Sequence, residues 1–281
     1  MSNEGPQIFA DHCNTVYIAG NGYGDIGQNI AENRPNILGV TNRDDFVNFV
    51  SEIHEEGLTE RESDGLGYIL AHESPEESDL AEVIWEGAEA QHPEDYADGF
   101  IELCRQDYDV DIVTAGIEEI AEITMNQRMN GYTPEVVGTR LTQENGIKQV
   151  EAYCSGDLKI EALKQKYDVE TLSDIPSIAL GNSDSNDGPM MEEAVIGIGR
   201  GRAFESADLY TEDDSEFWTR GTLVAITSAA LENGRAPEKA GREFMQATGN
   251  PSLEEVELGG NSGEEAKEIL DIYEKVKAVT P

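Results

Sequence analysis

Positively charged residues are scarce in this sequence, and lysine is absent before Lys148. Over 281 residues, 19 Lys and Arg stand against 58 Asp and Glu, which gives a formal net charge of −39. So large a negative charge repels both nucleic acids and anionic membrane surfaces. We therefore expect neither a nucleic-acid partner nor a membrane partner.

Cysteines and long apolar runs are also few. The three cysteines, at positions 13, 104 and 154, are too few and too far apart for a disulfide framework. No run approaches the roughly 18 apolar residues that a membrane span requires, and the first residues, MSNEGPQIFADHC, lack the basic and apolar regions of a secretory signal. The sequence therefore predicts a protein of the reducing cytoplasm.

The acidic residues are spread along the chain and do not form a terminal block. Dispersed carboxylates hold water and cations at multimolar salt, where charge repulsion is screened within about 3 Å at 1 M. This distribution is typical of cytosolic proteins of halophiles, whereas an acidic interaction tail concentrates its charge. With 38% hydrophobic residues, the chain still has enough apolar material for a sizeable core.

Three short apolar runs each lead into small or polar residues. They are QIFA, which ends before Asp11, VDIVTA, which contains Thr114, and PSIALG, which ends at Gly181. We interpret them as buried strands followed by helices, because in open α/β sheets the carboxyl ends of the strands carry the functional site. The expected fold class is α/β, with a doubly wound, Rossmann-like core.

The remaining segments predict additions to this core. Residues 16–104 contain helical patterns at 44–57 and 78–90, which favours a mostly helical cap inserted into a core made of residues 1–15 and 105–200. Residues 201–281 contain two more amphipathic patterns, at 215–234 and 264–279, and we expect a helical C-terminal extension that could carry a homodimer contact. Between core and extension, the segment GIGRGR favours a turn after a strand over a phosphate-binding loop.

Four polar elements follow one another in an order that carries chemical meaning. They are Asp11-His-Cys13-Asn-Thr15, Thr114-Ala-Gly116, Lys159 within SGDLKIEALKQKY, and the loop Gly181-Asn182-Ser183-Asp184-Ser-Asn-Asp187. This order resembles the haloacid dehalogenase superfamily over about residues 7–200. VTAGI and KIEAL look most like its phosphoserine phosphatase branch, and TNRDDFVNF and SDGLGYILA resemble an archaeal group of that branch.

The resemblance implies a phosphatase that acts on a small phosphorylated metabolite. Asp11 would be the nucleophile that forms an aspartyl-phosphate, Thr114 would donate to a phosphate oxygen, and Lys159 would neutralise phosphate charge. Gly116 and Arg43 are expected to contact the substrate, although Arg43 also fits the start of a helix. The resemblance further implies Mg²⁺ as cofactor. Its expected ligands are Asp11, Cys13, Asn182, Asp184 and Asp187.

Two departures from the family pattern leave an alternative open. Cys13 stands where the family has a second Asp, its general acid and base, and loss of such a group typically costs 10² to 10⁴ in rate. Asn182 stands where the family has a metal-binding Asp, and a neutral amide binds Mg²⁺ less well than a carboxylate; Ser183 or Asp184 could take its place. The alternative is a catalytically degenerate protein, which keeps the family's motifs in altered form and serves in binding or regulation.

A third interpretation is a dinucleotide-binding protein. The segment Gly22-Tyr-Gly24-Asp-Ile-Gly27 follows the apolar stretch TVYIAG, and Arg43 and Asp44 lie near the offset of a ribose contact. Against this, the following segment is short for a crossover helix and is broken by Pro35. A glycine-rich loop that enters the cap fits the pattern better.

Overall fold

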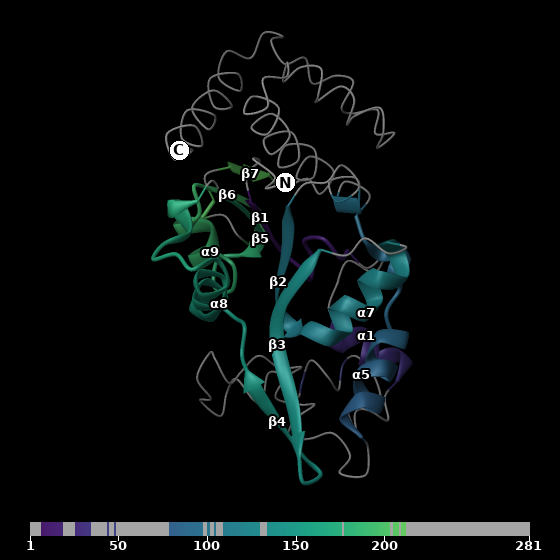
Figure 1. Ribbon diagram of the computed structural model, residues 1–281. Helices are drawn as coiled ribbons and strands as arrows, with labels where there is room; N and C mark the ends of the chain where they lie inside the picture. Colours follow the sequence, from purple (N-terminus) through teal and green to yellow (C-terminus); the bar gives the residue numbers. More distant parts are fainter. Residues whose placement is uncertain are drawn as a thin grey trace. The chain divides into compact units, whose positions relative to one another are not determined.

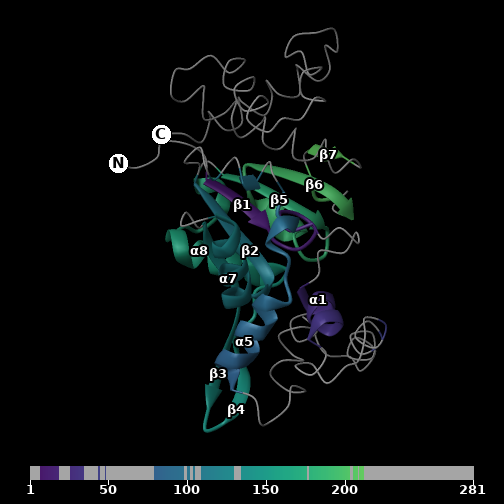
Figure 2. The same ribbon diagram turned by 90° about the vertical axis from the view of Figure 1, so that its right-hand side faces the viewer.

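The computed structural model describes the larger part of residues 7–211, drawn as coloured ribbon in Figures 1 and 2. The described residues are 7–18, 26–34, 44, 48, 79–97, 100, 101, 104, 109–129, 134–175, 177–202, 205–207 and 209–211. The chain divides into two compact units, each of which we describe by itself. Unit 1 comprises Met1–Ala10, Ala97–Asp111 and Leu163–Pro281, and unit 2 comprises Asp11–Tyr96 and Ile112–Ala162.

Among the described residues, seven strands form a sheet whose order differs from the order in the sequence. The strands are β1 (Gln7–Asp11), β2 (Val110–Ile117), β3 (Glu135–Glu144), β4 (Ile147–Ala152), β5 (Ser177–Ser183), β6 (Ile196–Arg202) and β7 (Leu209–Thr211). Their hydrogen-bonded order is β4-β3-β2-β1-β5-β6-β7, so the order reverses at β1. In α/β sheets, such a reversal marks the edge where ligands bind. The expected α/β fold is confirmed.

In unit 1, β1 pairs with β5, β5 with β6 and β6 with β7, all in parallel. Phe9 lies opposite Ala179, and both are fully buried. Strands buried on both faces need the continuous apolar runs that these segments have. Helix α9 (Gly188–Glu193) packs on β5 and β6, and two groups near the end of α8 (Asp157–Tyr167) hydrogen-bond to the buried carboxylate of Asp111 at the start of β2.

In unit 2, β3 and β4 form an antiparallel hairpin whose turn is Asn145-Gly146. Both turn residues have positive φ, 53° and 83°, which asparagine and glycine tolerate best. Helices α5 (Leu80–Glu89) and α7 (Glu118–Met129) pack against each other and against β3. The short helices α1 (Ile26–Asn33) and η1 (Pro93–Asp95) complete the described part of this unit, and η2 (Leu172–Asp174) belongs to unit 1.

Several expected elements are confirmed, and others are corrected. The strand at 7–11 and the helix at 80–89 occur as expected. The other two predicted strands also form but extend further, β2 by three residues beyond Thr114 to Ile117 and β5 by two residues beyond Gly181 to Ser183. The segment GIGRGR is not a turn but strand β6. The described residues beyond 200 include the end of β6 and strand β7, so the predicted extension does not begin as a helix.

Other expectations fall outside the described residues. Of the helix predicted at 44–57, only Asp44 and Asn48 are described, and both are helical and exposed. The helices predicted at 215–234 and 264–279 lie entirely outside the described residues. The domain boundaries stay predictions. Within the ranges that the structure describes, no helix has the length and apolar character of a membrane span.

Candidate functional site

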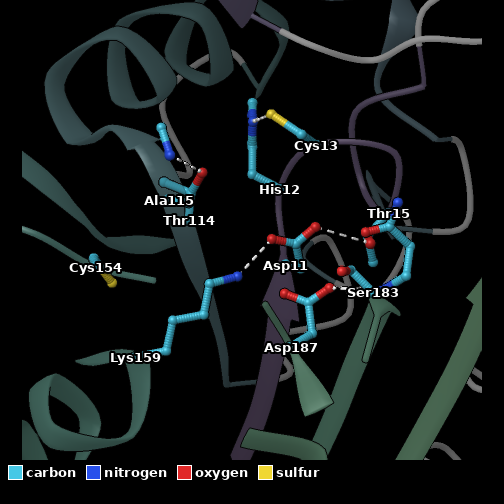
Figure 3. Close-up of polar contacts among 12 residues, drawn as sticks. Asp11, His12, Cys13, Thr15, Thr114, Ala115, Cys154, Lys159, Ser183 and Asp187 are labelled. Carbon is cyan, nitrogen blue, oxygen red and sulfur yellow. Dashed lines mark hydrogen bonds and ion pairs between the residues drawn. The ribbon is translucent and has the colours of Figure 1, made fainter. Parts of the chain in front are cut away.

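Asp11 ends β1, and both oxygens of its buried carboxylate are hydrogen-bonded (Figure 3). Oδ1 accepts a hydrogen bond of 2.7 Å from Nζ of Lys159, and Oδ2 accepts one of 3.0 Å from the hydroxyl of Thr15. Asp11 is 3% exposed and Lys159 is 0% exposed. Two opposite charges are thus held together away from water, where each depends on the other for its stability.

Lys159 reaches Asp11 because a tight turn starts α8 just before it. Gly156 has a φ of 50°, in the left-handed region that glycine adopts without strain. The carbonyl oxygens of Ser155 and Gly156 accept the N–H groups of Leu158 and Lys159, at 2.9 and 3.1 Å. The ammonium group therefore sits on a rigid first turn of helix and not on a loop.

Thr114 lies on β2 and is 1% exposed. The backbone N–H of Gly116 donates a hydrogen bond of 3.0 Å to Thr114 Oγ1. A hydroxyl can donate once and accept twice, so this contact uses a lone pair and leaves the hydroxyl hydrogen for an acceptor such as a phosphate oxygen. Gly116, predicted to contact substrate, orients Thr114 through its N–H.

The loop after β1 is folded back on the carbonyl group of His12. This carbonyl oxygen accepts the N–H groups of Thr15, Val16 and Tyr17, at 3.3, 3.1 and 2.9 Å. Asn14 supplies the necessary left-handed residue, with a φ of 60°, and asparagine tolerates this conformation better than most residues. The tight turn brings the Thr15 hydroxyl to the carboxylate four residues before it.

His12 is buried among aromatic side chains and is hydrogen-bonded at both ring nitrogens. Nε2 lies 2.8 Å from the hydroxyl of Tyr96, which donates to a backbone carbonyl, and Nδ1 lies 3.6 Å from Sγ of Cys13. The ring stacks on Tyr17 with a centroid distance of 5.4 Å. Burial, and then the nearby charge of Lys159, lower the pKa of His12 to about 3, so its imidazole is neutral.

Cys13, the residue in place of the family's second Asp, is half-buried. Its Sγ lies 3.6 Å from Nδ1 of His12, and the tautomer of the imidazole sets which of the two donates. This position carries a thiol where the family pattern has a carboxylate, and the thiol contacts the ring of His12.

In unit 1, the loop after β5 is organised around Asp187. Its Oδ2 accepts the backbone N–H groups of Asn182 and Ser183, at 2.9 and 3.0 Å, and the residue is fully buried. Position 181 must be glycine for this arrangement, since a Cβ there would lie 2.4 Å from Cβ of Asp187. The carboxylate of Asp187 thus ties the loop to the last two residues of β5.

Asp184, in the same loop, also binds backbone amides. Its Oδ1 accepts the N–H groups of Ser206 and Glu205, at 2.9 and 3.1 Å, and its Oδ2 accepts the N–H of Glu205 at 3.2 Å. The carboxylate therefore fastens the loop to the segment after β6. Ser183 Oγ lies 3.1 Å from the hydroxyl of Ser185.

Neither unit by itself offers a preformed Mg²⁺ site among its described donors. Mg²⁺ favours several oxygen ligands, at least one or two of them carboxylates. Positions 13 and 182 carry a neutral thiol and a neutral amide, and the Asp11 and Asp184 carboxylates already accept two or more hydrogen bonds each. Among the described residues, no three His, Cys, Asp or Glu side chains are grouped to hold a metal ion.

The predicted site residues therefore fall into two groups. In unit 2, the structure brings together Asp11 and Lys159 directly and places Cys13 and Thr114 in the same unit. In unit 1, it places Asn182 at the end of β5 and Asp184 and Asp187 in the loop that follows. Arg43 lies outside the described residues.

Three contributors to the site were not predicted. Thr15 binds Asp11, and its only sequence signal is its place four residues later, behind an asparagine that permits a tight turn. His12 and Tyr96 form a contact between residues 84 positions apart, for which a single sequence carries no local signal. Such contacts become visible only once the fold is known.

Comparison with known proteins shows similarity at the level of fold. No protein-family model matches the chain, and no curated protein sequence matches it. The structure of cytosolic 5'-nucleotidase IIIB bound to cytidine is similar with a TM-score of 0.53 and 14% identity, over 83% of this chain and 88% of that chain.

Two further solved structures are similar with TM-scores of 0.48. They are a phosphoserine phosphatase from T. onnurineus, with 17% identity over 79% of this chain and 97% of that chain, and a phosphoserine phosphohydrolase-like protein from Francisella tularensis, with 16% identity over 75% and 97%. The nucleotidase carries the conclusion about fold, because its TM-score exceeds 0.5. The chain is therefore similar in fold to this 5'-nucleotidase.

Proposed function

We propose that this chain is a phosphatase-like hydrolase of a small phosphorylated metabolite and that Asp11 is its nucleophile. The observation that carries the proposal is the buried contact of 2.7 Å between Asp11 and Lys159 at the carboxyl end of β1. A carboxylate oxygen of Asp11 would attack phosphorus while the bond to the ester oxygen breaks, and the leaving group would take up a proton from water. Water would then hydrolyse the acyl phosphate and release inorganic phosphate.

Lys159 and Thr114 have the properties that the transferring group requires. Phosphoryl transfer gains most from positioned charge and hydrogen-bond donors, because negative charge spreads over the equatorial oxygens. The Lys159 ammonium has three donors, so it can hold Asp11 with one and a phosphate oxygen with another. The hydroxyl hydrogen of Thr114 is oriented by the N–H of Gly116 for a second phosphate oxygen.

Mg²⁺ dependence is the part of the proposal that comes from the resemblance alone. The resemblance assigns the metal to Asp11, Cys13, Asn182, Asp184 and Asp187. In the steps above, the phosphate charge is neutralised by Lys159, and the metal requirement is measured separately in the assay that follows.

The test is hydrolysis of a panel of phosphomonoesters in multimolar KCl, with and without Mg²⁺. The panel includes phosphoserine and nucleoside 5'-monophosphates, because the structurally similar proteins are a phosphoserine phosphatase and a 5'-nucleotidase. Asp11→Asn is expected to reduce turnover by about 10³ or more, since no other group replaces a nucleophile. The matched control is Asp168→Asn, which removes an exposed charge. Equal turnover in Asp11→Asn and the wild type rejects the proposal.

A second candidate function is binding without turnover. It is favoured by the neutral groups at Cys13 and Asn182, which stand where the family has carboxylates. Calorimetry that detects inorganic phosphate binding without Mg²⁺, in a protein that hydrolyses none of the panel, supports this candidate. The double variant Cys13→Asp with Asn182→Asp then asks whether hydrolysis can be restored.

The dinucleotide interpretation loses support from the structure. The strand that it requires does not form in its described part, because residues 15–18 form a turn with an isolated bridge at Tyr17. Helix α1, which begins at Ile26, has only eight residues, short for a crossover helix. A fluorescence titration that detects no binding of NAD or NADP rejects this interpretation.

A further inference from the structure

One buried hydroxyl on β3 joins the two segments that carry Thr114 and Lys159. Thr139 is 0% exposed, and its Oγ1 donates a hydrogen bond of 2.7 Å to the carbonyl oxygen of Ala115. The same oxygen accepts a hydrogen bond of 3.2 Å from the N–H of Cys154. The side chain therefore bridges β2, one residue after Thr114, and the turn that leads into α8.

The neighbouring glycine makes this bridge possible by bringing β3 close to the end of β2. A Cβ at Gly138 would lie 2.8 Å from Cα of Glu118, the first residue of α7. The N–H of Gly138 also donates a hydrogen bond of 2.9 Å to Oε2 of Glu118. Residues 138 and 139 together hold the stretch 114–118, in which β2 turns into α7.

The other arm of the bridge leads to Lys159 through a short, fully hydrogen-bonded turn. Thr139 holds the N–H of Cys154, the two following residues form the turn, and the carbonyl of Gly156 accepts the N–H of Lys159 at 3.1 Å. Only four residues lie between Cys154 and Lys159. A shift of the turn therefore moves the start of α8 and, with it, Nζ of Lys159.

We propose that Thr139 is a positioning residue, whose hydroxyl sets the spacing between the strand that carries Thr114 and the helix turn that carries Lys159. The roles of those two groups rest on the proposed function. Both must meet oxygens of one phosphoryl group, and a misplacement of about 1 Å in such a constellation can cost on the order of 10² in rate. The spacing itself is a structural property, so it can also be measured without any turnover.

The test compares Thr139→Val, which removes the hydroxyl at nearly constant shape, with Thr139→Ser, which keeps it. Wild-type Lys159 is fully buried, so an amine-acylating reagent in multimolar KCl should modify it slowly. In Thr139→Val, loss of both hydrogen bonds is expected to raise acylation of Lys159 about tenfold, as followed by mass spectrometry. Lys164, on the same helix, is the internal reference and should not change.

The matched control is Thr124→Val in the same unit. Thr124 is 1% exposed, and its hydroxyl donates a hydrogen bond of 2.8 Å to the carbonyl of Ile120, so it has a similar burial and partner but no link to α8. The melting temperature of this variant should fall by about as much as that of Thr139→Val, whereas Lys159 should be acylated at the wild-type rate. Equal acylation of Lys159 in Thr139→Val and Thr124→Val overturns the proposal.

A kinetic comparison adds a readout that general destabilisation does not move. If the wild type hydrolyses a phosphomonoester, Thr139→Val should lower kcat about tenfold with a smaller change in KM, and Thr139→Ser should recover most of kcat. A kcat that Thr139→Ser does not restore counts against the proposal. Absence of wild-type turnover counts against the proposed function alone, and the acylation result then decides on Thr139.

A measurement on the wild type covers the case in which Thr139→Val does not fold. If Thr139 holds the turn, the Cys154 amide should exchange with deuterium as slowly as the amide of Lys159 in the first turn of α8. Exchange of Cys154 at the rate of an open loop overturns the proposal.

Discussion

Asp11 and Asp187 are both buried carboxylates at or just beyond the end of a parallel strand, and the groups that hydrogen-bond to them differ in kind. Asp11, the last residue of β1, accepts hydrogen bonds from the side chains of Lys159 and Thr15. Asp187, in the loop after β5, accepts them from the backbone N–H groups of Asn182 and Ser183, the last two residues of β5. Backbone amides can move only with the chain, whereas side-chain donors can turn toward another partner. The contacts of Asp187 therefore fix its loop to the strand, whereas those of Asp11 can rearrange.

The largest effect is expected when the buried Asp11 carboxylate loses its cation, Lys159. Lys159→Met leaves a carboxylate buried without its charge partner, which typically costs about 3–5 kcal/mol. We therefore expect a loss of that size in the free energy of unfolding, measured by urea denaturation in multimolar KCl. Adding Asp11→Asn removes the stranded charge, so the double variant should recover at least half of the loss.

The control for this prediction lies on the same helix. Lys164 pairs with Glu193, and both side chains are partly exposed, at 28% and 26%. Lys164→Met should therefore cost about 1 kcal/mol or less. Equal losses for the two lysine variants would show that burial of the Asp11 pair has no special weight.

The next prediction concerns the close packing of Gly181 against Asp187. In Gly181→Ala, the new Cβ would lie 2.4 Å from Cβ of Asp187, so the loop must shift or strain. Such overpacking typically costs about 1–3 kcal/mol, and we expect a loss of unfolding free energy in that range. Repeating the substitution in an Asp187→Ala background removes the clashing side chain and should shrink the effect of Gly181→Ala to less than half. An unchanged effect would assign the cost to the backbone alone.

The sequence predicts those parts of the fold that have a clear local sequence pattern. β1, β5 and α5 were predicted because apolar runs and an amphipathic pattern identify buried strands and a surface helix. The position of Asp11 at the end of β1 followed from the same pattern. The resemblance assigned Lys159 to the same site, to neutralise phosphate charge, but its direct pairing with Asp11 was not predicted, since the two residues lie 148 positions apart.

The elements that were missed have identifiable physical reasons. The β3–β4 hairpin was not predicted, although Asn145-Gly146 between alternating residues is a strong hairpin signal. β6 was predicted as a turn because glycines are rare in strands. Gly197 is required there by close packing, since a Cβ at this position would lie 2.8 Å from Cβ of Met191 on α9. Tertiary packing of this kind overrides local propensity and leaves no mark in the local pattern.

His12 is a buried titratable group that stays neutral beside the Asp11–Lys159 pair, so its titration reports on the environment of that pair. Burial and the Lys159 charge lower the pKa of His12 to about 3, whereas an unfolded chain binds this proton near pH 6.5. Between these values the unfolded state binds more protons, so the free energy of unfolding falls as the pH is lowered. The limit for one group is about 1.4 kcal/mol per pH unit, and about 1 kcal/mol is expected between pH 6.5 and 5.5.

The measurement is a series of urea denaturation curves over that pH range for three proteins. His12→Gln removes the titrating group and should flatten the pH dependence by about 1 kcal/mol per unit, whatever its effect on absolute stability. His92→Gln is the matched control, because the His92 side chain is 53% exposed, and its slope should equal that of the wild type. If His12→Gln keeps the wild-type slope, the histidine beside Asp11 takes up its proton in the folded state, and the buried environment of the Asp11–Lys159 pair is more polar than its packing indicates.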